Sequence, residues 1–334
     1  MLYLLKFTPR LFHKIWGGKS IKEWYRPASD DFENVGESWL ISAVEKYPTV
    51  VANGSHAGDS LQELLEVYMS DLVGDRVYEV FGNTFPLLIK FIDADDDLSI
   101  QVHPDDDYAL EHVGTLGKTE MWYVMDSSSE ASILLGWKHD MDEETIRQAI
   151  VEGNLQDYLK DYAVQRGDVV LLPARTVHAM KKGTIVAEIQ ENSDITYRLY
   201  DYNRCGNDGK TRPLHTENAL EVLNMYADTE GVRKCPQQKP IANLVKTPFF
   251  TTNRLRVDTA MQRDYAPLDS FVVYLCTSGK LRVQALDALD SEEDDAPMCV
   301  DVQKGEAVLI PACLNDIVLI PDTTAEVLEI YVEC

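Results

Sequence analysis

The sequence predicts a mainly β protein built from two jelly-roll β-barrels with helical insertions. This prediction rests on short strand patterns along most of the chain and on an internal repeat of one strand-and-turn pattern. The length of 334 residues supports it, because a single hydrophobic core seldom grows to this size and two domains are expected.

Short segments rich in Val, Ile, Leu and aromatic residues, bounded by Gly, Pro or Asp, predict the strands. Those of the N-terminal part are Phe85–Ile92, Ser99–Val102, Glu120–Met125, Val169–Leu172, Ile185–Gln190 and Ile195–Tyr200. Apolar residues that recur every three or four positions predict helices at about 60–72, 142–159 and 216–226. We interpret these helices as insertions and a bridge outside the β core.

The internal repeat relates Gly167–Ala174 to Gly305–Ala312. Each stretch reads as a turn, a buried strand and a Pro-closed end, which indicates two copies of one β-fold. Five residues after the Pro, the first copy has His178 and the second has Asp316. We therefore expect a first domain at 1–226 that includes the helices, a linker at 227–240, and a degenerate second domain without metal ligands at 241–334.

The charge balance excludes some partners. The chain has 31 basic and 56 acidic residues, a formal net charge of -25, which disfavours nucleic acid and anionic membranes. No apolar run is long enough for a signal peptide or a membrane span, and the six cysteines have the spacing of free thiols. We expect a cytoplasmic protein that binds neither nucleic acid nor membrane, as a monomer or weak homo-oligomer.

Four residues of the N-terminal part form a candidate metal site. Gln101 and His103 flank Val102 in a strand pattern and therefore project to one side. Glu120 begins a strand, and His178 follows the repeated Pro-closed strand. A single strand His is more often a core or surface residue, but this set matches the order of ligands in cupin barrels and suits one Zn²⁺ or another divalent metal per chain.

The other histidines occur in loop or helix patterns, and we expect them to be surface residues without partners. They are His13, His56, His112, His139 and His215. On this interpretation only the N-terminal barrel carries a metal site.

Three cations lie where barrel interiors should be apolar. Lys90 lies in an apolar strand, Lys118 lies two residues before Glu120, and Arg198 lies in the strand after Glu188. For any one of them alone, a role in binding a ligand is about as well supported as a simple structural explanation. In the structural explanation the cation pairs with a local carboxylate or reaches solvent. Together, near a metal, they would suit a phosphorylated sugar, because Arg and Lys both bind phosphate.

Several strings of the sequence resemble the type I mannose-6-phosphate isomerases (phosphomannose isomerases) in their short bacterial form. They are Trp16–Gly18, Gly36–Trp39, Phe85–Lys90, Leu98–Asp105, Gly117–Glu120, Pro173–Ala179 and Glu188–Arg198. The resemblance reaches the helix predicted after Pro213, and the C-terminal hundred residues or so match only by the cupin-like pattern.

The resemblance implies an enzyme that interconverts mannose 6-phosphate and fructose 6-phosphate through a metal-stabilised enediol. It implies Zn²⁺ ligands at Gln101, His103, Glu120 and His178. It implies a catalytic pocket with Lys118, Glu188 and Arg198, and a phosphate or pocket role for Ser99 and Lys90. Either Lys118 or Glu188 is expected to move the proton. Longer members have a His where this chain has Gly117, so no ring-opening residue is assigned.

Two rival functions remain compatible with a cupin fold. A non-catalytic sugar-phosphate-binding or regulatory module would keep the cations and tolerate loss of the base. A cupin metal oxygenase would need two imidazoles and a carboxylate, but would not require Lys90 or Arg198.

Overall fold

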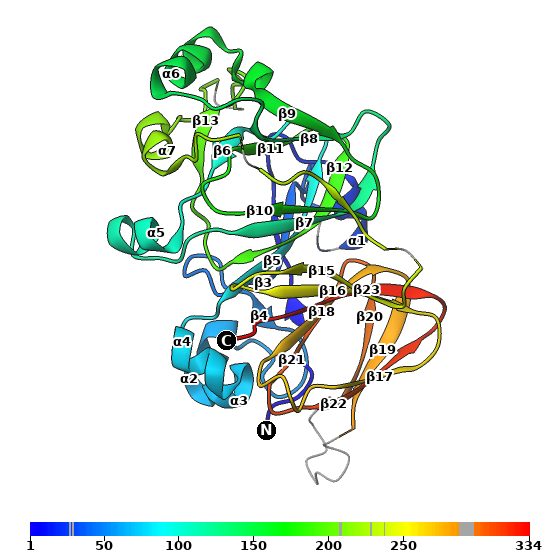
Figure 1. Ribbon diagram of the computed structural model, residues 1–334. Coiled ribbons are helices and arrows are strands. Elements are labelled where there is room, and N and C mark those ends of the chain that lie inside the picture. The colour runs from blue at the N-terminus through cyan, green and yellow to red at the C-terminus, as the bar shows by residue number, and fades with distance from the viewer. Residues whose placement is uncertain (27, 29, 207–208, 228, 237, 287–296) are drawn as a thin grey trace. The chain divides into compact units, whose positions relative to one another are not determined.

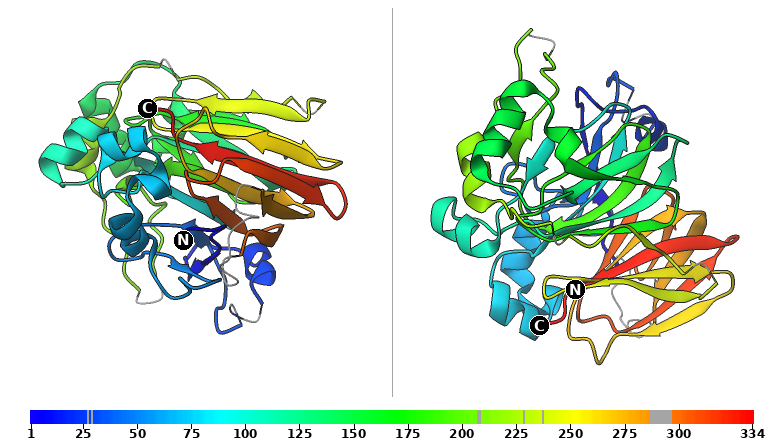
Figure 2. Two further views of the ribbon diagram at one scale, coloured as in Figure 1. Left: turned by 90° about the horizontal axis from the view of Figure 1, so that it is seen from below. Right: turned by 45° about the horizontal axis from the view of Figure 1, so that its top comes forward.

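The computed structural model describes residues 1–26, 28, 30–206, 209–227, 229–236, 238–286 and 297–334. The fold is mainly β, and strands predominate in every view (Figures 1 and 2). The six strands predicted in the N-terminal part are all present, and no end is shifted by more than two residues. Within the described ranges, no helix is both long and apolar enough to cross a membrane.

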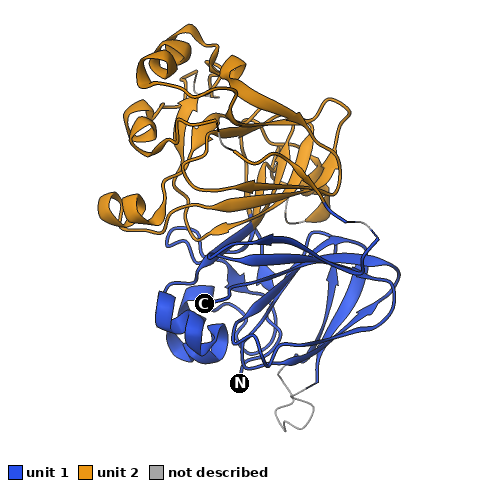
Figure 3. Cartoon of the chain, viewed as in Figure 1, with its two compact units in different colours: residues 1–10, 39–89, 235–334 blue, residues 11–38, 90–234 orange. Residues whose placement is uncertain are grey.

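The chain forms two compact units, shown in Figure 3. Unit 1 contains residues 1–10, 39–89 and 235–334, and unit 2 contains residues 11–38 and 90–234. This division differs from the expected one, because 1–10 and 39–89 group with the C-terminal part. Hydrogen bonds explain the difference: Leu5 and Leu309 exchange two backbone bonds of 2.9 Å, and the Ala312 N–H donates to the Leu72 carbonyl at 3.0 Å. One boundary, after Lys234, lies within the predicted linker 227–240.

Unit 2 contains most of a seven-stranded sheet and all of a five-stranded sheet. The seven-stranded sheet has the order β14 (Arg233–Lys234), β10 (Asp168–Leu172), β7 (Glu120–Ser127), β12 (Thr184–Glu191), β5 (Leu87–Ala94), β3 (Glu37–Ile41), β2 (Arg10–Phe12). The five-stranded sheet has the order β13 (Tyr197–Tyr200), β6 (Ile100–Val102), β11 (His178–Met180), β8 (Ser132–Trp137), β9 (Leu159–Ala163).

The core of unit 2 follows from the alternation of side chains along the strands. In β8, Ile133 and Leu135 pack in one apolar cluster with Trp122 of the seven-stranded sheet. Leu134, between them, packs in another cluster with Ile146 of a helix. The two sheets therefore face each other, and helices cover the outer face of the smaller sheet.

The predicted helices are present but shorter than expected. The 60–72 segment is split into α2 (Leu61–Tyr68) and α3 (Ser70–Val73) by Met69, whose φ is 45°. The 142–159 segment is α6 (Glu143–Glu152), left-handed Gly153, the 3₁₀ helix η1 (Leu155–Tyr158) and the start of β9. A residue with positive φ ends a helix, and periodicity alone does not locate it. The 216–226 segment is α7 (Thr216–Val222), and the prediction missed α1 (Ser20–Trp24), α4 (Asp75–Phe81) and α5 (Asp106–His112).

Unit 1 contains a second pair of facing sheets and a small sheet of β1 (Phe7–Thr8) and β4 (Val50–Val51). The five-stranded sheet has the order β15 (Ile241–Lys246), β16 (Thr251–Val257), β23 (Ala325–Tyr331), β18 (Val272–Ser278), β21 (Ala307–Ile310). The four-stranded sheet has the order β17 (Met261–Asp264), β22 (Asp316–Pro321), β19 (Lys280–Ala285), β20 (Cys299–Gln303). One apolar cluster joins residues of both sheets, such as Leu255 and Val283.

The two units repeat one strand order. The order β10, β7, β12, β5, β3 corresponds to β21, β18, β23, β16, β15, and the order β6, β11, β8, β9 corresponds to β17, β22, β19, β20. The repeated sequence supplies β10 and β21, and both of its glycines have positive φ, 87° at Gly167 and 93° at Gly305. Both turns therefore require a left-handed residue, which explains why each copy has glycine there.

The repeat places a buried glutamate at the same register position in both units. The equivalent ladders of paired residues are Val170–Trp122–Glu188 and Val308–Tyr274–Glu329. Glu329 accepts hydrogen bonds from Arg263 Nε at 2.8 Å, from Tyr265 Oη at 2.5 Å and from Asn253 Nδ2 at 2.8 Å. The Arg263 guanidinium thus compensates the fully buried Glu329 carboxylate.

The substitution Arg263→Met is expected to lower the free energy of unfolding by about 3 kcal/mol, because it leaves the buried Glu329 charge without its cation. Denaturant titration measures the change. Adding Glu329→Gln to the same chain should recover much of the loss, since the amide is neutral and still forms hydrogen bonds. A double variant as unstable as Arg263→Met would contradict this account.

Candidate active site

Three of the predicted metal ligands meet in unit 2. His103 follows β6, Glu120 begins β7 and His178 begins β11, and one potential ligand atom from each lies within 4.8 Å of the others. All three side chains are buried. Gln101 joins the group, because its Nε2 lies 3.3 Å from His178 Nε2. The structure therefore brings together the four residues that the sequence singled out from separate strands.

The outer nitrogens of both imidazoles are held by backbone carbonyls. His103 Nδ1 lies 2.7 Å from the Ile195 oxygen, and His178 Nδ1 lies 2.9 Å from the Thr176 oxygen. A carbonyl only accepts, so Nδ1 carries the proton in each ring and Nε2 offers a lone pair to the cluster. Burial lowers the pKa of both histidines, and Lys118 lowers that of His103 further. Neutral imidazoles are the form that binds a metal.

The carboxylate of Glu120 completes a donor set that fits a divalent cation. Its Oε1 is buried without a hydrogen-bond partner and lies 3.3 Å from the unprotonated Nε2 of His178. Two facing lone pairs repel unless a cation lies between them. Burial by itself would raise the pKa of Glu120, but the nearby Lys118 ammonium brings it below its ordinary value, so the carboxylate is ionised. Two imidazole nitrogens and a carboxylate oxygen are the donor types of zinc sites.

Lys118 supplies positive charge inside this cluster. Its ammonium donates to Glu120 Oε2, lies 3.1 Å from His103 Nε2 and lies 4.0 Å from Glu188 Oε1. The expectation that Lys118 and Glu120 share a face is met, although Lys118 precedes the first residue of β7.

A second buried ion pair lies on β5 and β12. Lys90 Nζ lies 2.5 Å from Glu188 Oε2 and 3.9 Å from Glu37 Oε2. Trp122 Nε1 donates to the other Glu188 oxygen at 2.7 Å. Burial lowers the pKa of Lys90 to about 8, and the Glu37 carboxylate opposes this shift. The carboxylate that compensates the buried Lys90 charge is therefore that of Glu188, and the Glu37 carboxylate lies nearby.

Arg198 approaches the site from β13, where it pairs with Gln101 across the strands. Its Nε donates to Ser99 Oγ at 3.2 Å, and Ser99 Oγ donates to Gln101 Oε1 at 3.3 Å. Burial lowers the pKa of Arg198, with Arg212 as the next cause. A chain of hydrogen bonds thus links the guanidinium to a predicted metal ligand.

One cavity of unit 2 brings the predicted side chains together. Its walls include Ser99, Gln101, Lys118, Lys90, Glu188 and Arg198. They also include residues to which the sequence analysis gave no role, namely Lys14, Trp16, Glu37, Trp122 and Arg212. Trp16 and Glu37 lie in two of the sequence strings that resemble the family, and this resemblance could have marked them as site residues. Nothing in the local pattern marked Lys14 or Arg212.

The expectation that the other histidines lack partners is wrong for three of them. His56 Nδ1 lies 3.0 Å from Asp59 Oδ2, and His112 Nδ1 lies 3.0 Å from the Tyr108 oxygen. His215 Nδ1 accepts the Arg198 backbone N–H at 3.1 Å. Partners distant in sequence, as at His215, are decided by the tertiary fold.

Gly117 has no room for a side chain. A Cβ there would lie 2.5 Å from the Asp105 carbonyl carbon and 2.5 Å from the Asp106 nitrogen, closer than real Cβ contacts. The backbone at this position therefore excludes the His of longer family members. Asp106 Oδ1 accepts the Gly117 N–H at 2.7 Å, and Glu191 Oε2 accepts the Thr119 N–H at 2.6 Å, so two carboxyl groups hold the segment that carries Lys118.

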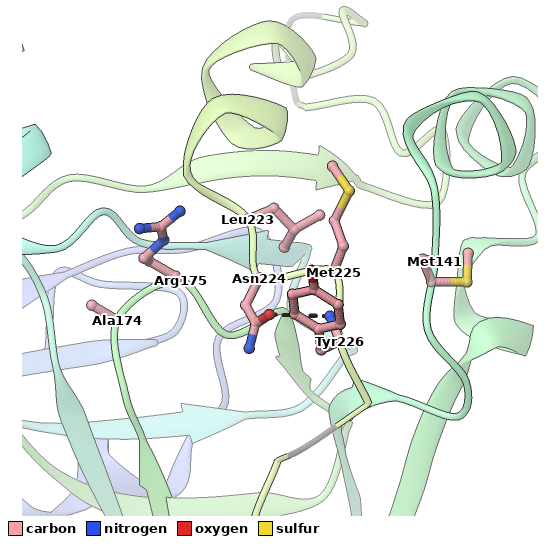
Figure 4. Close-up of a pocket in the computed structure, with 7 residues that line it drawn as sticks. All are labelled: Met141, Ala174, Arg175, Leu223, Asn224, Met225 and Tyr226. Atoms are coloured by element: carbon pink, nitrogen blue, oxygen red, sulfur yellow. Dashed lines mark hydrogen bonds between the residues drawn. The ribbon is translucent and has the colours of Figure 1, made fainter.

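A second cavity of unit 2 is lined by none of the predicted site residues (Figure 4). Its lining is Met141, Ala174, Arg175, Leu223, Asn224, Met225 and Tyr226. Arg175 is held from two sides, because its Nε donates to the Val222 oxygen at 2.8 Å and its Nη1 to Asp105 Oδ2 at 3.2 Å. We assign this cavity no part in the chemistry.

Comparison with known proteins identifies relatives of the chain. Residues 4–131 match the family model of the phosphomannose isomerase type I catalytic domain. A probable mannose-6-phosphate isomerase of Bacillus subtilis is 40% identical over 268 residues, 77% of this chain and 81% of that protein. The mannose-6-phosphate isomerase of Streptococcus mutans is 36% identical over 280 residues, 82% of this chain and 85% of that protein.

Solved structures agree with these matches. The crystal structure of mannose 6-phosphate isomerase from Bacillus subtilis superposes with a TM-score of 0.84 at 30% identity, covering 98% of this chain and 99% of that one. A putative mannosephosphate isomerase from Archaeoglobus fulgidus has a TM-score of 0.78 at 21% identity, covering 100% and 99%. At that identity the second match supports the fold alone.

Glu191 gives the site a pH-dependent contribution to stability. Burial raises the pKa of Glu191 to about 8, the Thr119 N–H opposes the shift, and the Asp106 carboxyl adds to it. The folded chain thus keeps a proton that the unfolded chain releases near the ordinary carboxyl pKa. This contribution is complete below pH about 4 and is lost as the pH rises toward the folded value.

The isosteric variant Glu191→Gln should remove this dependence. Its free energy of unfolding is expected to rise relative to the parent chain between pH about 5 and 8, and the difference should level off above that range. Denaturant titrations of both chains across these pH values measure it. Parallel profiles would show that Glu191 is already ionised in the folded chain at neutral pH.

Proposed function

Because the chain belongs to the type I phosphomannose isomerase family, we propose that it interconverts mannose 6-phosphate and fructose 6-phosphate. The reaction moves a proton between C2 and C1 through an enediol or enediolate. Relatives that bear this activity in their names share 36–40% of the aligned residues and cover most of the chain. The observation that carries the proposal is the buried His103–Glu120–His178 cluster beside Lys118, which itself lines a cavity rich in cations.

The proposed cofactor is one Zn²⁺ per chain, or another divalent metal, held by Gln101, His103, Glu120 and His178. When bound, such an ion supplies Lewis-acid stabilisation to the oxygens of the reacting carbons, worth several kcal/mol. The hydrogen bonds from Nδ1 of His103 and of His178 to backbone carbonyls orient the two rings for this role.

We assign the proton transfer to Lys118 in preference to Glu188. Both oxygens of Glu188 are engaged, one with Lys90 at 2.5 Å and the other with Trp122 at 2.7 Å. Lys118 Nζ lies directly beside the cluster, 3.1 Å from His103 Nε2. Lys118 can take the proton only as the neutral amine, so its ammonium must first give up a proton. A positioned general base contributes roughly 10²–10⁴-fold to the rate. Glu188 then fixes Lys90 in the pocket.

Arg198 is proposed to stabilise the negative charge that develops on the substrate. Its guanidinium lines the cavity and is linked through Ser99 to Gln101. Ser99 and Lys90 are proposed to help hold the phosphate or the pocket around it. Buried, oriented donors of this kind need no reorganisation during the reaction.

The fold proposed for this function is a pair of cupin-like barrels of which only the N-terminal one carries a metal site. The repeated strand order and the ladders that end at Glu188 and Glu329 support it. In this proposal catalysis belongs to residues 1–226, and 241–334 form the degenerate copy. The cytoplasmic location, the monomeric or weakly homo-oligomeric state and the absence of nucleic-acid or membrane partners remain predictions.

The direct test is a coupled assay for fructose 6-phosphate formed from mannose 6-phosphate. The purified chain is expected to contain about one divalent metal, to lose activity in strong chelator and to regain it on addition of Zn²⁺. A regulatory module would bind the sugar phosphate without turnover. Full activity of a metal-free chain in chelator would overturn the metal proposal.

The substitution Arg198→Ala is expected to lower kcat by about 10²–10³-fold, because one oriented donor to the developing charge is lost. Metal content should remain that of the parent chain, since Arg198 is not a proposed ligand. Exposed Arg256→Ala in unit 1 is the control and should leave kcat unchanged. Equal turnover by Arg198→Ala and the parent would remove Arg198 from the mechanism.

A further inference from the structure

Arg198 lies on a strand at the edge of its sheet. This strand, β13, stands at one end of the five-stranded order of unit 2 and pairs with β6. Backbone groups on the outer side of an edge strand have no ladder partner, so they need another acceptor or donor. For Arg198, whose guanidinium lines the cavity of the candidate site, His215 supplies both.

His215 takes the place of a neighbouring strand. Its backbone N–H donates to the Arg198 carbonyl at 2.8 Å, and its Nδ1 accepts the Arg198 N–H at 3.1 Å. Two residues of an antiparallel pair exchange the same two bonds through their backbones alone. The imidazole replaces the backbone acceptor here, because the His215 carbonyl is used by the first turn of α7, where it accepts the Ala219 N–H at 2.9 Å.

The same short segment also holds the guanidinium of Arg198. Its Nη1 donates to the Pro213 carbonyl at 3.1 Å, while its Nε donates to Ser99 Oγ at 3.2 Å. Residues 213–215 thus fix the backbone and the side chain of Arg198 together. His215 is not among the residues that line the cavity, so any effect that it has on the reaction passes through Arg198.

The bond at His215 Nδ1 depends on a neutral ring. A backbone N–H only donates, so Nδ1 carries a lone pair and the proton of the neutral ring is on Nε2. Protonation would set an N–H of the ring against the Arg198 N–H and add positive charge near the guanidinium. Burial lowers the pKa of His215, and Arg198 lowers it further. The bond is therefore present at neutral pH and is lost as the pH falls below the ordinary histidine value of about 6.5.

Few other ionisable groups act on this ring. Tyr197 of β13 lies with its ring centroid 6.3 Å from that of His215, and burial raises the pKa of Tyr197, which keeps it neutral. Glu217 of α7 is bonded to Arg147 of α6 at 2.6 and 2.7 Å. Among the groups described here, Arg198 is thus the charge that titration of His215 affects most directly.

We propose that His215 is a positioning residue for the isomerase reaction, whose neutral imidazole fixes Arg198 for its role and whose protonation releases it. The inference rests on the proposed function, because the role of Arg198 belongs to that reaction. An oriented donor stabilises a developing charge without reorganisation, and a donor that must first be ordered loses part of this advantage. Release of Arg198 should therefore lower kcat and affect KM little.

The first test is the kinetics of His215→Leu, which removes the acceptor and keeps an apolar side chain of similar length. We expect kcat to fall about tenfold at pH about 8 with KM within about threefold of the parent, the pattern of an interaction made in the transition state. The loss should be smaller than in Arg198→Ala, because the guanidinium is still present. A parent-like kcat in His215→Leu would overturn the proposal.

The conservative variant His215→Asn separates the acceptor from its titration. The amide Oδ1 can accept the Arg198 N–H as Nδ1 does, and the amide stays neutral at acid pH. We expect His215→Asn to recover most of the kcat that His215→Leu loses at pH about 8. The ratio of parent kcat to His215→Asn kcat should fall at least threefold between pH about 8 and about 5.5.

This ratio isolates His215, because protonation of other site groups and of the substrate phosphate acts on both chains alike. A ratio that does not change with pH would overturn the role of the neutral ring. The comparison of parent and His215→Asn decides the outcome if His215→Leu does not fold. The control is His139→Asn at an exposed loop histidine, which should leave kcat and its pH profile unchanged.

The double variant His215→Leu/Arg198→Ala tests whether the effect passes through Arg198. Two residues that act as a unit are not additive, so the double variant should turn over no more slowly than Arg198→Ala. A further tenfold loss would show that His215 acts through another group, and the proposal would be wrong. Metal content should match that of the parent in each of these chains, since neither residue is a proposed ligand.

A spectroscopic measurement distinguishes failure of this inference from failure of the proposed function. A parent chain without isomerase activity would overturn the function. In that case the NMR signal of the Arg198 Nε–H still tests the coupling, because it reports on the guanidinium directly. We expect this signal to shift with the same midpoint as the His215 ring in the parent and to lose that shift in His215→Asn. A signal that ignores the protonation of His215 would overturn the coupling.

Discussion

The structure of the site depends on the compensation of buried negative charge, above all at Glu120. Its carboxylate is fully buried between two imidazoles whose outer nitrogens are already committed to carbonyls. Such a charge is costly unless cations lie beside it. Lys118 supplies part of that charge, and the unpartnered Oε1 facing His178 marks a place for more. The donor set and the position of Lys118 therefore have a common physical cause.

The second copy solves the same problem in another way. Glu188 and Glu329 occupy equivalent register positions, and both are buried. Glu188 is compensated by Lys90 inside a cavity, whereas Glu329 is compensated by Arg263 within a closed set of tyrosine and asparagine hydrogen bonds. A carboxylate whose charge and hydrogen bonds are satisfied internally requires no metal and no substrate. One β pattern can thus place a glutamate ion pair beside a cavity in one copy and inside a closed set of hydrogen bonds in the other.

Much of the site was predictable because it depends on local regularities. Strand alternation placed Gln101 and His103 on one side, and the repeated Pro-closed strand located His178. The cations Lys90 and Arg198 were noticeable because they interrupt apolar strands. Lys14, Arg212 and His215 were not predictable in this way. Their positions depend on contacts between separate segments, such as the hydrogen bond from the Arg198 N–H to His215 Nδ1. The pattern of residues along one segment does not reveal such contacts. The helix breaks at Met69 and Gly153 were missed for a similar reason, since positive φ leaves little trace in periodicity.

The sequence by itself determined the mainly β class, the repeat, the four candidate ligands and the family, because these depend on residue type and on spacing along one strand. Only the tertiary structure decided which carboxylate compensates which cation, and that 1–10 and 39–89 group with the C-terminal part. Pairing energies depend on distance and burial, and both are set by how separate strands come together.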